Sequence, residues 1–156
     1  MKDIFDRLFP VKVDNNYTGY PIAKWVFLII IIPSVIRSLI HMFAPDSGAQ
    51  SIATIPLDTF TQNGANSVIL MLALWGSAQF LMSIVYIVVL WRYKSLIPLM
   101  YILMFLEYSL RMFLMHIKPI HISGTAPGHV IDYALVPLSL IMFFLSIAKA
   151  KSKLNI

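Results

Sequence analysis

The chain has 156 residues, of which 59% are hydrophobic and 12% are charged, and its mean hydropathy is +0.80. This composition excludes an ordinary water-soluble domain, which cannot carry so much apolar surface, and a disordered chain, which needs high charge. The absence of cysteine excludes disulfides and cysteine-ligated metal sites. The net charge of +5 does not indicate nucleic-acid binding, because the Lys and Arg residues stand singly between apolar runs.

Four apolar stretches are each long enough to cross a hydrocarbon core of about 30 Å, which needs roughly 20 helical residues. We expect these spans at about residues 22–43, 66–91, 96–117 and 130–148. Only helices or closed barrels satisfy the backbone hydrogen bonds in lipid, and these runs lack the alternation of barrel strands. The sequence therefore predicts an all-α integral membrane protein in which residues 1–156 form a single four-span domain.

The positive charges outside these spans are divided unequally. The amino-terminal segment, the second connection and the tail together carry nine: Lys2, Arg7, Lys12, Lys24, Arg92, Lys94, Lys149, Lys151 and Lys153. The other two connections carry only Lys118. The positive-inside rule then predicts that both termini are cytoplasmic. We expect a multi-pass protein of the inner (plasma) membrane of bacterial type.

The connections indicate how the helices follow one another. The short segment Trp91–Ser95 predicts that the second and third helices are antiparallel neighbours, and Thr125–Gly128 predicts a tight turn with Pro and then Gly at its centre. The result is an antiparallel four-helix bundle, running up-down-up-down. The long first connection, Ala44–Ala65, either covers the outer end of the bundle as a lid or is a simple exposed loop.

Residues 2–9 contain apolar side chains at helical spacing, namely Ile4, Phe5, Leu8 and Phe9. On a helix these side chains would share one face, with charged residues elsewhere. The pattern predicts a short interfacial helix lying on the inner membrane surface. A frayed terminus with scattered apolar residues is the alternative.

Function in such a protein is expected at polar residues that lipid should exclude. Glu107 lies near the predicted midplane, and Arg111 follows one helical turn outward, in the favourable order for an ion pair along one helix face. Arg37 needs a partner from another helix, for which Glu107 and Asp132 are the candidates. The candidate ligand-binding residues are Arg37, His41, Trp75, Gln79, Glu107, Arg111 and Asp132.

We expect these residues to enclose a polar pocket that opens toward the outside, with Glu107 near its floor. Alternatively, the charged network only fixes the register of the helices, as buried polar groups do in some bundles. Several histidines would lie near the outer surface with Asp132, but their spacing matches no ligand motif, so no metal site is predicted: His41, His116, His121 and His129. No catalytic motif is present, which leaves enzymatic activity and any cofactor open.

The layout resembles the small four-helix bacterial membrane proteins of the DoxX-like group. The resemblance covers most of the chain, in layout more than in exact motif. The features that carry it are a basic residue in the first helix, which ends in Phe43, Ala44 and Pro45; Gly76 and Gln79 in the second; the turn Arg92, Tyr93, Lys94 and Ser95; and Glu107 with Arg111 in the third. Some members of that group are linked to quinone-coupled sulfur oxidation or are accessory partners in redox defence, and most have no assigned activity, so the resemblance carries over no catalytic residue. The lack of cysteine argues against handling of sulfur.

Three functions remain for this chain. The first is binding of a small amphiphile, a quinone or a lipid, or service as a subunit of a membrane redox complex, with another membrane subunit or a second copy as partner. The second is a structural or assembly subunit without a ligand. The third is a proton-linked small carrier with Glu107 as the titrating group, which four short helices suit poorly unless the protein dimerises.

Overall fold

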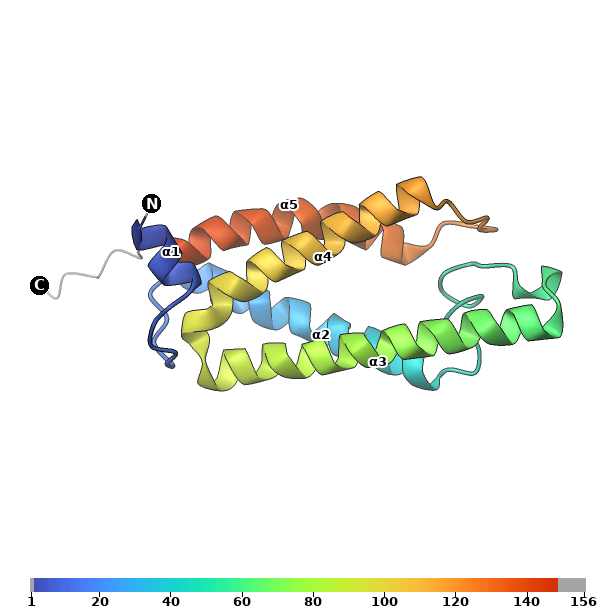
Figure 1. Ribbon diagram of the computed structural model, residues 1–156, viewed down its shortest axis with the longest axis horizontal. Coiled ribbons are helices and arrows are strands. Elements are labelled where there is room, and N and C mark those ends of the chain that lie inside the picture. The colour runs from blue at the N-terminus through green and yellow to red at the C-terminus, as the bar shows by residue number, and fades with distance from the viewer. Residues whose placement is uncertain (1, 149–156) are drawn as a thin grey trace, which may run out of the picture.

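The computed structural model describes residues 2–148, and all regular secondary structure in that segment is helical. A short α1 (Lys2–Leu8) precedes four long helices, α2 (Pro21–Phe43), α3 (Gln62–Arg92), α4 (Ile97–Ile117) and α5 (Pro127–Ile147) (Figure 1). Two single 3₁₀ turns, η1 (Leu57–Thr59) and η2 (Lys94–Leu96), lie in the connections. The four long helices are long and apolar enough to cross a membrane, and the third of these spans includes the η2 turn before α4. The prediction of an all-α chain with four such helices is therefore confirmed.

Two of the predicted features concern the end of the chain and the start of a helix. The lysines of the tail, Lys149, Lys151 and Lys153, lie outside the described residues. Helix α3 begins at Gln62, earlier than expected, because the side chain of Thr61 caps it by accepting a hydrogen bond from the Gly64 amide at 3.3 Å.

The start of α5 corrects a second expectation. Pro127 and Gly128 lie in the first turn of this helix, so the tight turn predicted around them is wrong. The physical reason is that proline is favourable at the first helical position, where its missing N–H would have no partner in the helix.

The four long helices pack as two pairs. Helix α2 lies along α3, and α4 lies along α5, while α2 and α5 also contact each other. Helices α3 and α4 contact each other much less, and Figure 1 shows them diverging from the turn that joins them. The short connection therefore makes α3 and α4 neighbours chiefly near the turn, and the bundle splits between them farther along.

The main core lies near the α3–α4 turn, in the half of the bundle where all four long helices stay together, which we call the closed half. The ring of Phe27 lies edge-on to Tyr86 and to Tyr101, with ring centroids 5.6 Å away in each case. The Tyr101 hydroxyl donates a hydrogen bond of 2.5 Å to the carbonyl oxygen of Ala23. Such edge-to-face packing stabilises aromatic clusters beyond the burial of their area.

The amino-terminal segment closes this end of the bundle. Arg7 donates to the carbonyl oxygen of Ile147 at 2.6 Å, and the hydroxyl of Ser95 donates to the carbonyl oxygen of Asp14 at 2.9 Å. Residues 2–8 form the expected short helix, on which the side chains of Ile4 and Phe5 are exposed. Its location at a membrane surface stays a prediction.

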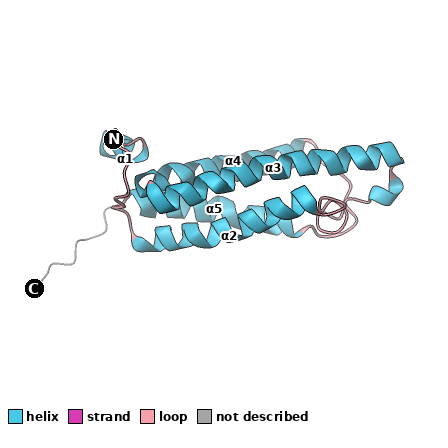
Figure 2. Cartoon of the chain, turned by 90° about the horizontal axis from the view of Figure 1, so that it is seen from below, coloured by secondary structure: helices cyan, strands magenta, loops and turns pink. Residues whose placement is uncertain are grey.

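The first connection forms a folded unit at the opposite end, which we call the 44–61 cap. Within the cap Ala49, Ile55 and Leu57 are buried, and they pack with Ala65 at the start of α3. The carbonyl oxygen of Thr54 accepts from the Ser123 amide at 2.8 Å, which ties the cap to the third connection. Figure 2 shows that the loops gather at the two ends of the bundle.

Candidate functional site

An ion network joins α4 to α5 in the half of the bundle where α3 and α4 have diverged, which we call the split half. The guanidinium group of Arg111 contacts Glu107 Oε1 at 2.6 Å and Asp132 Oδ1 at 3.0 Å. Asp132 is only 2% exposed, and a buried carboxylate is stable only when it is paired. The predicted pair of Glu107 and Arg111 is thus present, and a carboxylate from a second helix completes it.

Arg37 on α2 does not form the expected ion pair with a carboxylate. Among residues 2–148 it forms no salt bridge, so the expected pairing with Glu107 or Asp132 is wrong. Its partner is Gln79 on α3, whose amide oxygen, when turned toward the two guanidinium groups, accepts from Arg37 Nη2 at 3.2 Å and from Arg111 Nη2 at 3.0 Å. Arg111 takes one oxygen of each carboxylate, and the Gln79 amide bridges the two guanidinium groups.

The indole of Trp75 packs against both arginines. The Cζ atom of Arg111 lies 5.0 Å from the ring centroid, and that of Arg37 lies 5.8 Å away. Cation–π attraction of this kind offsets part of the repulsion between two cations held close together. Arg37 Nε is buried and has no hydrogen-bond partner among the described residues.

His41 links this cluster to the 44–61 cap. Its ring lies 5.0 Å from that of Trp75, and its Nδ1 lies 2.7 Å from the carbonyl oxygen of Ser47. Helices α2 and α3 approach closely here, because a Cβ atom on Gly76 would lie 2.5 Å from His41 Cβ. Within the described segment, no three His, Asp or Glu side chains gather in a metal-binding arrangement.

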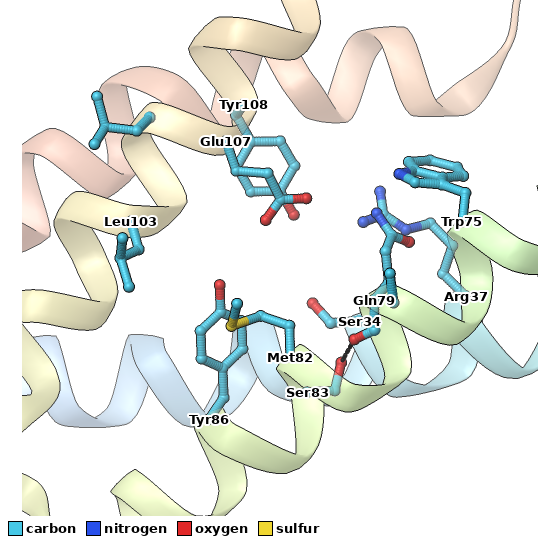
Figure 3. A pocket seen from close by; sticks show the side chains of 12 residues that line it. Ser34, Arg37, Trp75, Gln79, Met82, Ser83, Tyr86, Leu103, Glu107 and Tyr108 are labelled. Carbon is cyan, nitrogen blue, oxygen red and sulfur yellow. Dashed lines mark hydrogen bonds between the residues drawn. The ribbon is translucent and has the colours of Figure 1, made fainter.

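A cavity of about 380 Å³ lies beside the network, between α3 and α4 with α2 behind it (Figure 3). Its volume falls in the range of small-molecule sites, roughly 300 to 1,000 Å³. Its lining comes from three helices: Ser34, Arg37, Trp75, Ala78, Gln79, Met82, Ser83, Tyr86, Leu103, Leu106, Glu107 and Tyr108.

The cavity opens at the side of the bundle. The exposed members of its lining are Trp75, Ala78 and Met82 on α3, together with Leu103 and Leu106 on α4. This mouth is almost entirely apolar, and it lies where the two helices have diverged. The expected opening toward the outer end is therefore corrected, since the gap between the helix pairs faces sideways.

The seven predicted site residues occupy different places around this cavity. Four of them line it, namely Arg37, Trp75, Gln79 and Glu107. Arg111 and Asp132 lie behind that wall and hold Glu107 in place through the ion network. His41 contacts Trp75 and the cap, and it does not line the cavity.

Two tyrosines of the lining were not among the predicted site residues. The ring of Tyr108 lies 4.8 Å from Arg111 Cζ, and its position three residues before Arg111 could have indicated this contact. Tyr86 lies on the same stripe of α3 as Gln79, seven residues further along, which is a signal at helical spacing. Both side chains are buried at the wall of the cavity.

Comparison with protein-family models, curated proteins and solved structures finds no match to this chain. The DoxX-like resemblance therefore stays a prediction from the layout of the helices. The functional interpretation therefore depends on the lateral cavity, which has an apolar mouth and a charged inner wall.

Proposed function

We propose that the chain is a multi-pass membrane protein whose lateral cavity binds the polar head of a small amphiphile, such as a quinone or a lipid. One observation carries this proposal: a single cavity combines an exposed apolar mouth with a wall that holds Arg37, Gln79 and Glu107. An amphiphile matches both parts, because its tail stays in contact with lipid at the mouth while its head reaches the polar wall.

The proposal includes an orientation in the membrane. The helices run up-down-up-down, and both termini face the cytoplasm of a bacterial-type inner membrane. Two contacts support this arrangement: Arg7 bonds to Ile147 at one end, and Thr54 bonds to Ser123 at the other. The basic residues of the amino-terminal segment and of the second connection then lie on the inner side, as the positive-inside rule requires.

Glu107 is the residue best placed to orient the bound head. Its side chain is 38% exposed, and one of its oxygens is held by Arg111. The other oxygen makes no hydrogen bond to a described residue, so it can accept one from a ligand. The guanidinium of Arg37 is the neighbouring donor, and the side chains of Trp75 and Met82 contact the ring or tail.

Mass spectrometry of the extract from detergent-purified protein tests this function. Ala78→Trp fills the mouth of the cavity, and Ala134→Trp places the same side chain on an exposed face of α5. We expect a stoichiometric amphiphile from the wild type and from the Ala134 variant, and its loss from the Ala78 variant. Equal recovery from both variants, or no amphiphile from the wild type, would contradict the proposal.

A structural or assembly subunit, with a second membrane protein or another copy as its partner, is the second candidate. The observation that favours it is the satisfied network, in which Arg111 already binds both Glu107 and Asp132. Glu107→Gln separates the two functions, because a purely structural network tolerates a neutral hydrogen-bonding side chain there. The structural role would be favoured if the Glu107→Gln protein stays folded and keeps a constant partner on native gels, and if the wild type carries no amphiphile.

A further inference from the structure

The cavity holds a second polar group that the ion network does not use. Tyr86 is 4% exposed, and its hydroxyl makes no hydrogen bond to any residue in the described part of the chain. Figure 3 shows this hydroxyl pointing into the cavity, on the side opposite the carboxylate of Glu107. The ring is fixed by its edge-on contact with Phe27, so the hydroxyl is held in that direction. The hydroxyl oxygen itself is open to the cavity, since Arg37 Nε is the only buried polar side-chain atom without a partner among the described residues, so a ligand in the cavity can hydrogen-bond to it.

The two facing groups have complementary hydrogen-bonding requirements. A carboxylate such as that of Glu107 only accepts hydrogen bonds, whereas the phenol of Tyr86 can donate one. A ligand between them that uses the proton of Tyr86 therefore donates toward Glu107 and accepts from Tyr86. A single hydroxyl group does both, because it carries one proton and two lone pairs.

The charges around the cavity restrict the ligand further. In their ionised forms, Arg37 and Arg111 balance Glu107 and Asp132, so the site carries no net charge. A phosphate head could pair with Arg37 only beside the carboxylate of Glu107, which repels it, and an ammonium head could pair with Glu107 only beside the guanidinium of Arg37, so the loss of hydration is poorly compensated for either. The charge balance therefore favours an uncharged head.

We propose that Tyr86 and Glu107 together bind a hydroxyl group on the uncharged head of a membrane amphiphile. This inference rests on the proposed function and specifies the chemistry of its ligand. A glycerolipid with a free hydroxyl and a hydroquinone with an apolar tail both present that chemistry. The ligand's hydroxyl lies between the two side chains, and its apolar part leaves through the mouth beside Met82 and Leu106.

Fluorescence of Trp75 provides a direct readout, because this indole lines the cavity. The other two tryptophans, Trp25 and Trp91, lie outside the lining and are exposed, so Trp25→Phe with Trp91→Phe leaves one reporter. The full chain in micelles is titrated with dioctanoylglycerol, its methyl ether, decylhydroquinone and dioctanoyl phosphatidate. We expect a saturable change of Trp75 fluorescence with dioctanoylglycerol, with decylhydroquinone or with both. The methyl ether and the phosphatidate should bind at least tenfold more weakly. The hydroxyl probe that binds more tightly identifies the class of the natural ligand.

A conservative variant tests the tyrosine itself. Tyr86→Phe removes only the hydroxyl, and we expect it to weaken the hydroxyl probes about tenfold, as loss of one hydrogen bond does. Tyr93→Phe is the matched control at the end of the same helix, outside the cavity, and should leave binding unchanged. The comparison of dioctanoylglycerol with its methyl ether on the unmodified site needs no variant, so the test holds even if Tyr86→Phe folds poorly.

The outcomes separate this inference from the proposed function. Equal binding to the folded Tyr86→Phe protein, or equal binding of the methyl ether, would overturn the hydroxyl-binding role and leave amphiphile binding intact. Phosphatidate that binds as tightly as dioctanoylglycerol would overturn the argument from charge balance. Failure of every probe, together with no amphiphile in the purified protein, would overturn the proposed function as well.

Discussion

Tyr101 and Tyr86 both pack against the ring of Phe27 but differ in the surroundings of their hydroxyl groups. Both rings lie edge-on to Phe27 at 5.6 Å. The Tyr101 hydroxyl bonds to Ala23 inside the core, whereas the Tyr86 hydroxyl points into the cavity and has no partner among the described residues. The same ring contact therefore belongs to a satisfied core on the Tyr101 side and to the wall of the cavity on the Tyr86 side.

The difference between the halves follows from the path of α4. Near the turn, Ser95 is bonded to Asp14 and holds α4 close to the rest of the bundle. Farther along, α4 follows α5, to which Arg111 and Asp132 tie it. Because α4 diverges from α3, the polar groups between these helices stay uncovered, and the split half becomes a candidate site.

The largest expected effect comes from breaking the split half. Arg111→Leu leaves Asp132 buried without its partner and frees Glu107, which should lower the free energy of unfolding by about 3–5 kcal/mol. Unfolding of the protein in mixed micelles with increasing sodium dodecyl sulfate measures this change. Addition of Asp132→Asn to the variant should recover part of the loss. Unchanged stability of the single variant would show that the network is not structural.

The contact between α2 and α3 should give the next largest effect. Gly76→Ala places a methyl group 2.5 Å from His41 Cβ and 3.1 Å from the carbonyl oxygen of Ser38, which forces the helices apart. We expect a loss of about 1–3 kcal/mol, as for other overpacked sites. Gly128→Ala is the matched control, because no atom lies within 4 Å of its added methyl group. Equal stability of the two variants, measured in the same micelles, would argue against the close approach.

The two tyrosines should differ in their effects on stability. Tyr101→Phe removes the bond to Ala23 and should lower the unfolding free energy by about 1 kcal/mol. Tyr86→Phe removes a hydroxyl that has no protein partner, so its effect should stay within about 0.5 kcal/mol in ligand-free protein. A thermal or detergent unfolding comparison checks both values. A larger loss for Tyr86→Phe than for Tyr101→Phe would reverse the proposed distinction.

The smallest effect concerns the 44–61 cap at low pH. Partial burial alone would raise the pKa of Asp46, but hydrogen bonds from the amides of Ser51, Gly48 and Gln50 outweigh burial and lower it. The folded cap therefore gains stability from ionised Asp46 above the ordinary carboxyl pKa, and this gain is lost as the pH falls through the lowered value.

Hydrogen-exchange protection factors of those cap amides measure this dependence. We expect protection to decrease below the ordinary carboxyl pKa, and Asp46→Asn should show low protection at every pH. Asp58→Asn, also in the cap, is the control and should retain the wild-type profile. Protection that does not change with pH in the wild type would contradict the role assigned to Asp46.

The helices and one ion pair were predictable from the sequence because they depend on local spacing. Long apolar runs predict the four helices, and the four-residue spacing of Glu107 and Arg111 predicts their pair. The choice of Gln79 as the partner of Arg37 was not predictable, because it depends on how α2, α3 and α4 place the two guanidinium groups relative to one another. The side opening was missed for a similar reason, since helix divergence depends on packing across all four helices.

Depth-dependent quenching of Trp75 tests most directly whether the cavity opens to lipid and takes an amphiphile. The protein with Trp75 as its only tryptophan is placed in bilayers whose acyl chains carry bromine. We expect bromines on the chains to quench Trp75, and dioctanoylglycerol to relieve that quenching saturably as it fills the cavity. Quenching by aqueous iodide alone, with no response to brominated chains or to dioctanoylglycerol, would contradict a cavity that opens to the membrane.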